Sequence, residues 1–159
     1  MTNAPAPEVL STEQLDRYHN NGFLLMEDAV PPDILRRLRE VFDLWTEESR
    51  THQGPYGETI DGRPRFDVEP GHSAGQPGLR RVASPTEVSE DYLAFMRDNI
   101  ALDATTQVFG QNLRFRESKV NSKLPGTATH LKYHQDLPFG PLTNQDLITV
   151  LFLLDDVSD

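Results

Sequence analysis

Two stretches decide how this chain is interpreted: the segment Tyr133-His134-Gln135-Asp136 and the apolar run Leu147-Ile148-Thr149-Val150-Leu151-Phe152-Leu153-Leu154. His134 and Asp136 are two residues apart, and on an extended strand that spacing places both side chains on one face. One imidazole and one carboxylate supply two of the three protein ligands of a two-histidine, one-carboxylate site for non-haem Fe(II). We therefore predict a metal-binding strand over residues 131–136. The apolar run has the length of a strand, and we expect it to be buried on both faces.

A His-x-Asp triplet alone is a weak signal, because so short a motif also arises by chance. Its surroundings are more specific. The order and spacing of five segments together resemble the phytanoyl-CoA dioxygenase family of Fe(II)- and 2-oxoglutarate-dependent oxygenases: Tyr18-x3-Gly22-Phe23, Asn121-Ser122-Lys123-Leu124-Pro125-Gly126, Tyr133-His134-Gln135-Asp136-Leu137-Pro138-Phe139, Asp146-Leu147-Ile148 and Asp155-Asp156-Val157-Ser158.

The resemblance implies an α+β fold, in which amino-terminal helices precede a double-stranded β-helix (a jelly roll of the cupin type). It also implies that Fe(II), 2-oxoglutarate and O2 are required, and that a small-molecule substrate is hydroxylated while 2-oxoglutarate is decarboxylated to succinate. Position by position, His134 and Asp136 match iron ligands, Lys119 and Asn121 match contacts to 2-oxoglutarate, and Phe152 matches an aromatic residue beside that cosubstrate. From residue chemistry alone, Lys119 suits a dicarboxylate, but an exposed strand lysine is an equal alternative, and plain core packing is the simpler role for Phe152.

The resemblance implies that the family's second iron-binding histidine and its 2-oxoglutarate-binding arginine would follow Asp159. No histidine follows His134. We therefore expect residues 1–159 to be the amino-terminal part of one oxygenase domain in a longer protein, with an incomplete jelly roll that is inactive by itself. A natural truncation that cannot turn over is the alternative.

Within this domain we expect a tail over residues 1–9, a mainly helical front over 10–110 and the first jelly-roll strands over 111–159. Ser11-x-x-Gln14 is a capping box that begins a helix, and Gly22 ends it. A short strand is predicted over residues 23–26.

A second helix is predicted from Pro32, because its apolar residues recur at intervals of three and four as far as Trp45. Residues 51–85 are rich in glycine and proline, so we expect an irregular loop with a short strand over residues 65–68. Further helices are expected over 88–96 and 100–109, and strands from Leu113 onward. His52 and His72 lie in the loop and are interpreted as solvated residues rather than ligands.

Composition excludes several classes of function. The chain has 159 residues, a formal net charge of −10 and no cysteine. This charge disfavours nucleic acids and anionic membranes as partners, and the absence of cysteine excludes disulfides and thiolate sites. Residues 1–8 are polar and proline-rich, unlike a signal peptide. We expect a soluble cytoplasmic protein whose partner is a small-molecule substrate.

Two alternatives to the oxygenase stay open at this stage. One is a non-catalytic jelly-roll or cupin-like module that binds a small molecule. The other is a metal-dependent isomerase or hydrolase of the cupin type, which would need a further ligand near His134 such as His130 or Glu117.

Overall fold

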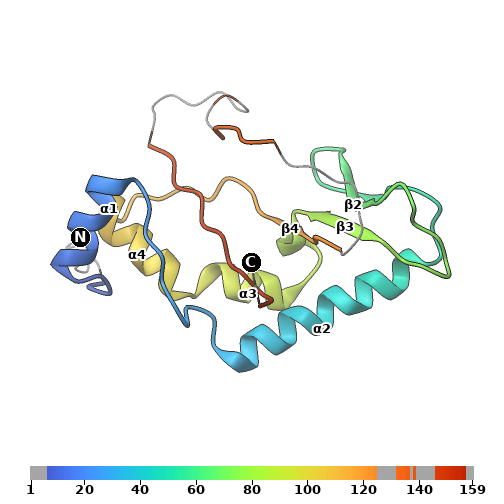
Figure 1. Cartoon of the computed structure of the whole chain (residues 1–159), viewed down its shortest axis with the longest axis horizontal. Coiled ribbons are helices and arrows are strands. Elements are labelled where there is room, and N and C mark those ends of the chain that lie inside the picture. The colour runs from blue at the N-terminus through green and yellow to red at the C-terminus, as the bar shows by residue number, and fades with distance from the viewer. Residues whose placement is uncertain (1–6, 125–131, 137, 139–145, 157–159) are drawn as a thin grey trace. The chain divides into compact units, whose positions relative to one another are not determined.

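Helices and one antiparallel sheet make up the structure, which is α+β as expected. The computed structural model describes residues 7–124, 132–136, 138 and 146–156. The elements in chain order are α1 (Thr12–Asn21), α2 (Pro32–Ser49), β1 (Tyr56–Glu58), β2 (Pro64–Val68), β3 (Leu79–Ala83), the 3-10 turn η1 (Pro85–Glu87), α3 (Glu90–Arg97), α4 (Ile100–Phe109) and β4 (Lys119–Asn121) (Figure 1). The chain divides into two units: Met1–Pro31, Met96–Phe115 and His134–Asp159 form the first, and Pro32–Phe95 and Arg116–Tyr133 form the second.

The helix ends of the first unit follow directly from local sequence. The Gln14 amide donates to Ser11 Oγ (3.2 Å), and the Ser11 amide donates to Gln14 Oε1 (2.9 Å), which completes the predicted capping box. Gly22 ends α1 with φ +77°, a left-handed conformation that glycine adopts without steric cost. Asn99 caps α4 by accepting a hydrogen bond from the Leu102 amide.

The segment before α1 is anchored to α4 by one side chain. Gln107 Oε1 accepts hydrogen bonds from the Val9 and Leu10 amides at 2.9 and 2.7 Å, and its Nε2 donates to the Leu10 carbonyl at 2.9 Å. Residues 1–6 lie outside the described part of the chain, but the end of the predicted tail at Val9 is held in place.

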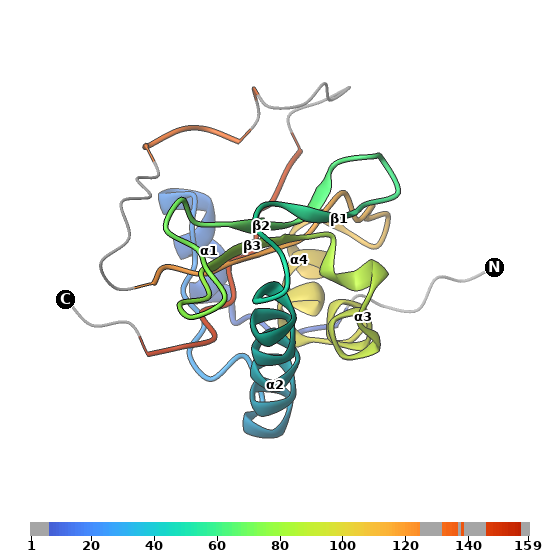
Figure 2. The ribbon, with the colours of Figure 1, turned by 90° about the vertical axis from the view of Figure 1, so that its right-hand side faces the viewer.

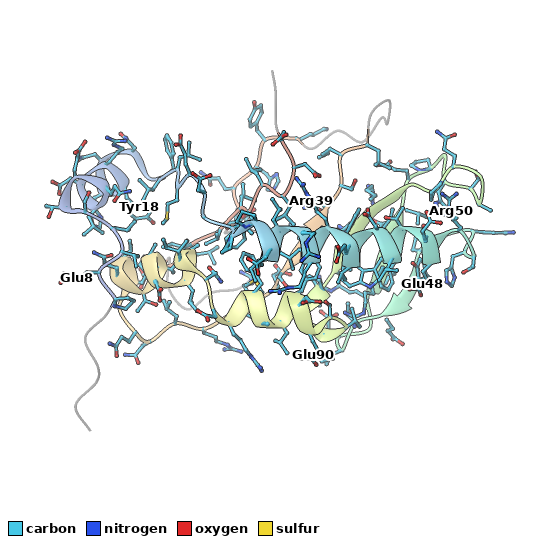
Figure 3. All side chains as sticks on the ribbon, turned by 90° about the horizontal axis from the view of Figure 1, so that it is seen from below. Glu8, Tyr18, Arg39, Glu48, Arg50 and Glu90 are labelled. Atoms are coloured by element: carbon cyan, nitrogen blue, oxygen red, sulfur yellow. The ribbon has the colours of Figure 1, made fainter. Side chains whose placement is uncertain are left out.

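In the second unit, α2 packs against the sheet through the predicted apolar stripe. Leu38 and Trp45 are buried, and charged residues such as Arg39 and Glu48 (labelled in Figure 3) are exposed on the helix. In Figure 2, α2 lies on one side of the strands β1, β2 and β3. Amphipathic spacing thus correctly predicted both the helix and its buried face.

The sheet has the strand order β1-β2-β3-β4, and every neighbouring pair is antiparallel. Tyr56 pairs with Phe66, Phe66 with Val82, and Val82 with Val120. Directly paired residues share a face, so these four side chains form one apolar face. Trp45 meets Phe66 edge-on with ring centroids 5.8 Å apart, and it stacks on Tyr92 at 5.2 Å.

Residues 51–85 differ most from expectation. The sequence predicted an irregular loop with one short strand over residues 65–68. β2 confirms that strand, but β1 and β3 also form in the segment predicted to be irregular. Glycine and proline mark the turns between these strands rather than a continuous loop: Gly62, at φ +80°, lies between β1 and β2. Pairing between distant residues produced the sheet, and local composition does not report such pairing.

The other predicted strands are shorter or unpaired. No strand is assigned over residues 23–26, 113–118 or 146–154, nor in the described part of 131–136. Residues 147–154 are not buried on both faces either, because Leu151 and Leu153 are 81% and 66% exposed. A strand exists only where its backbone finds a hydrogen-bonding partner, and within residues 7–124, 132–136, 138 and 146–156 these segments have none in a ladder.

None of the described helices is both long enough and apolar enough to cross a bilayer.

The buried stripe of α2 provides a stability test within one helix. We expect Leu38→Ala to lower the free energy of unfolding by about 2–5 kcal/mol, because Leu38 is 1% exposed and its loss leaves a cavity. Leu44→Ala is the matched control, since Leu44 is 69% exposed and its truncation should change stability by less than about 0.5 kcal/mol. Urea denaturation followed by tryptophan fluorescence measures both. Equal losses in the two variants would contradict the packing described here.

Candidate metal centre

His134 and Asp136 lie side by side in the first unit. His134 Nε2 is 3.3 Å from Asp136 Oδ1, so the two side chains point toward each other. No secondary-structure element is assigned over residues 132–135, and the chain bends at Asp136. The expected juxtaposition is therefore present, although no sheet supports it in the described part of the chain.

This spacing fits two ligands of a single metal ion. Two ligand atoms in adjacent octahedral positions, each about 2.1 Å from the metal, are about 3 Å apart. An imidazole nitrogen and a carboxylate oxygen are also the donor types that non-haem Fe(II) takes. In a metal site of this type the pair would supply two of the three protein ligands. Among the described residues, no group of three histidine, cysteine, aspartate or glutamate side chains is gathered for a metal.

Thr149 holds the carboxylate from its far side. Its Oγ1 donates a hydrogen bond of 2.8 Å to Asp136 Oδ2, which leaves Oδ1 directed at His134. Hydrogen bonds of this kind orient metal-ligating carboxylates. The sequence alone did not single out Thr149, which is a polar residue within an apolar run. The sequence nevertheless contains a signal for this contact, because a hydroxyl group within an apolar run needs a hydrogen-bonding partner when it is buried.

The positions matched to the cosubstrate belong to different units of the chain. Phe152 belongs to the first unit and is half-buried. Lys119 and Asn121 begin and end β4 in the second unit; both are exposed, and they pair in register with Ala83 and Arg81. The roles of Lys119, Asn121 and Phe152 toward 2-oxoglutarate stay predictions.

The two histidines of the predicted loop have structural roles. His72 Nδ1 accepts a hydrogen bond from the Gly78 amide (2.9 Å), so its Nε2 carries the proton and faces the Ser49 and His52 carbonyls at 3.0 and 3.1 Å. The His52 ring stacks on Tyr56 with centroids 3.6 Å apart. Both side chains are half-buried and make specific contacts, whereas the sequence predicted solvated loop residues. His72 joins the end of α2 to the β2–β3 connection.

The cupin-type isomerase or hydrolase would need a further ligand, for which the sequence offers Glu117 or His130. Glu117 lies 3.9 Å from the Arg63 guanidinium. His130 falls outside the described residues.

Comparison with known proteins identifies what this chain is similar to. The family described as phytanoyl-CoA dioxygenase (PhyH) matches residues 18–159. A protein of Stutzerimonas stutzeri named "Probable alpha-ketoglutarate-dependent hypophosphite dioxygenase" is 27% identical over 148 residues, which cover 92% of this chain and 49% of that protein. The chain thus spans about half the length of this curated relative. No solved structure gives a significant match.

The hydroxyl of Thr149 can be tested separately from catalysis. We expect Thr149→Val to weaken Mn(II) binding by about 10–100-fold, because Asp136 loses the donor that orients it while the side-chain shape is kept. Thr149→Ser retains the hydroxyl and should bind the ion as the wild type does. Anaerobic titration of the complete gene product, followed by the electron paramagnetic resonance of free Mn(II), measures both affinities. Unchanged binding in Thr149→Val would contradict this role.

Proposed function

Because the chain belongs to the phytanoyl-CoA dioxygenase family, we propose that it forms part of an Fe(II)- and 2-oxoglutarate-dependent dioxygenase. The observation that supports this most directly is the 3.3 Å contact between His134 Nε2 and Asp136 Oδ1, at the two positions that match the family's iron ligands. The name of the 27% identical relative agrees with this chemistry.

The complete protein in this proposal has the double-stranded β-helix of the cupin type. The antiparallel sheet β1–β4, covered on one face by α2, provides one wall of it. Residues outside this sequence contribute the remaining strands, the third iron ligand and the arginine that pairs with 2-oxoglutarate. The length of the relative, of which this chain covers 49%, leaves room for them.

Each candidate residue then has a distinct task. His134 and Asp136 hold Fe(II), and Thr149 keeps the carboxylate oriented. Lys119 and Asn121 bind 2-oxoglutarate through charge and hydrogen bonding, and Phe152 packs beside it. Iron together with O2 and 2-oxoglutarate supplies the oxidation, in which the cosubstrate loses CO2 to become succinate and the small-molecule substrate gains a hydroxyl group.

The test is succinate formation by the complete gene product with Fe(II), 2-oxoglutarate and a panel of small molecules that includes hypophosphite. We expect His134→Ala to lower the rate about 100-fold or more, because the iron loses an essential ligand. His19→Ala is the matched control; His19 is exposed on α1 and should not affect the rate.

Two outcomes would overturn the proposal. Succinate formation that survives in His134→Ala would remove this residue from the iron site. A wild-type protein that binds 2-oxoglutarate but makes no succinate with any substrate would be a non-catalytic binding module instead.

A further inference from the structure

One imidazole in the second unit holds the connection between β2 and β3 against the end of α2. The Nε2 atom of His72 lies 3.0 Å from the Ser49 carbonyl oxygen and 3.1 Å from that of His52. On the other side of the ring, Nδ1 accepts a hydrogen bond of 2.9 Å from the Gly78 amide. The imidazole is half-buried and Ser49 is fully buried, so these contacts are largely shielded from water.

The partners of this ring determine its protonation state. A backbone N–H can only donate, so Nδ1 must offer a lone pair to Gly78, and a carbonyl can only accept, so Nε2 must carry the hydrogen. The imidazole is therefore neutral in this structure. A second proton on Nδ1 would point at the Gly78 N–H, which removes one hydrogen bond and opposes two donors. The imidazolium ion and the closed contact thus exclude each other.

The connection that His72 holds, residues 69–78, is a folded segment in its own right. The Glu69 amide donates to the Gly78 carbonyl at 2.8 Å, and the His72 amide donates to the Glu69 carbonyl at 2.9 Å. Arg50 adds a tie to α2, because its Nη1 donates to the Ala74 carbonyl at 2.7 Å from an exposed position. Release of the imidazole therefore removes the half-buried part of the attachment and leaves an exposed hydrogen bond.

We infer that His72 is a pH-sensitive latch between α2 and the connection of residues 69–78. The latch is closed while the imidazole is neutral, and it opens when Nδ1 takes up a proton. An imidazole in water takes up this proton as the pH falls through about 6.5. Because the open form binds one proton more than the closed form, the stability of the closed latch is present above this range and is lost below it. The inference does not depend on the proposed function, since none of these residues belongs to the candidate metal centre.

The elements that contact His72 also carry other charged or titratable groups. From α2 and the turn after it these are Glu47, Glu48, Arg50 and His52, and from the ends of β2 and β3 they are Glu69 and Arg80. A hydrogen bond from Arg50 holds the pKa of the Glu47 carboxyl below its usual value. Carboxylates in water take up protons near about pH 4, and arginine stays charged, so His52 is the group whose titration would overlap with that of His72.

Hydrogen exchange of the complete gene product, resolved to single amides, measures the opening. We expect the protection of the Gly78 amide, relative to its exchange rate in the unfolded chain, to fall about tenfold per pH unit between about pH 6 and 5, because one proton is taken up per opening. The Leu38 amide, in the middle of α2, is the internal reference and should keep its protection over the same range.

Three variants separate His72 from other acid effects. In His72→Asn the side-chain oxygen replaces Nδ1 as the acceptor for Gly78, and in His72→Gln the amide nitrogen replaces Nε2 as the donor to the α2 carbonyls. Neither side chain takes up a proton in this range, so the protection of Gly78 should no longer depend on pH. His52→Phe is the matched control, because it removes the other imidazole while an aromatic ring still stacks on Tyr56, and it should behave as the wild type does.

Three results would overturn the inference. A wild-type Gly78 amide whose protection is constant between about pH 7.5 and 5 would show that protonation does not open the latch. The wild-type pH dependence persisting in both His72→Asn and His72→Gln would assign it to another group. An equal loss of protection at Leu38 would show that acid unfolds α2 as well, rather than releasing the connection alone.

Discussion

The contact between Trp45 and Phe66 determines the orientation of the sheet in the second unit. It turns the ladder from Phe66 through Val82 to Val120 toward α2, and Val82 is fully buried as a result. Because successive residues of a strand alternate between faces, a shift of one residue would exchange every side chain between them. Burial of the aromatic pair therefore also determines which polar residues face away from the helix.

Those polar residues include buried charged side chains, which are stable only because residues distant in sequence form hydrogen bonds or ion pairs with them. Arg65 is 5% exposed, and it donates to the carbonyls of Glu58, Ala83 and Ser84 and to the Glu87 carboxylate. A buried guanidinium without these acceptors would cost several kcal/mol, on the order of the whole stability of a small domain. Asp67 differs, because two arginines, Arg80 and Arg81, contact its carboxylate and both are partly exposed.

The candidate metal ligands of the first unit show a similar arrangement. Asp136 uses one carboxylate oxygen toward His134 and the other toward Thr149, so both oxygens are engaged before any ion binds. Pre-orientation of this kind reduces the conformational freedom that a ligand loses when the metal binds. It also assigns a role to the one hydroxyl within residues 147–154, whose sequence otherwise suggests only core packing.

Local sequence alone determined the ends and faces of the helices. The capping box at Ser11, the stop at Gly22 and the stripe from Leu38 to Trp45 depend on residues within a few positions of one another, and the structure confirms each. The spacing of two also predicted that the side chains of His134 and Asp136 would be neighbours, and they lie 3.3 Å apart, although the strand predicted to carry them is not assigned in the described residues.

The sheet was decided by tertiary structure. The local sequence of residues 51–85 predicts mainly an irregular loop, whereas in the structure three strands pair there. β4 joins them from a part of the chain that is distant in sequence. Pairing between residues far apart in sequence carries no local signature, since its free energy comes from partners and burial rather than from propensity. For the same reason the neighbourhood of Arg81 and Asn121, and the hydrogen bond from Thr149 to Asp136, emerged only from the folded chain.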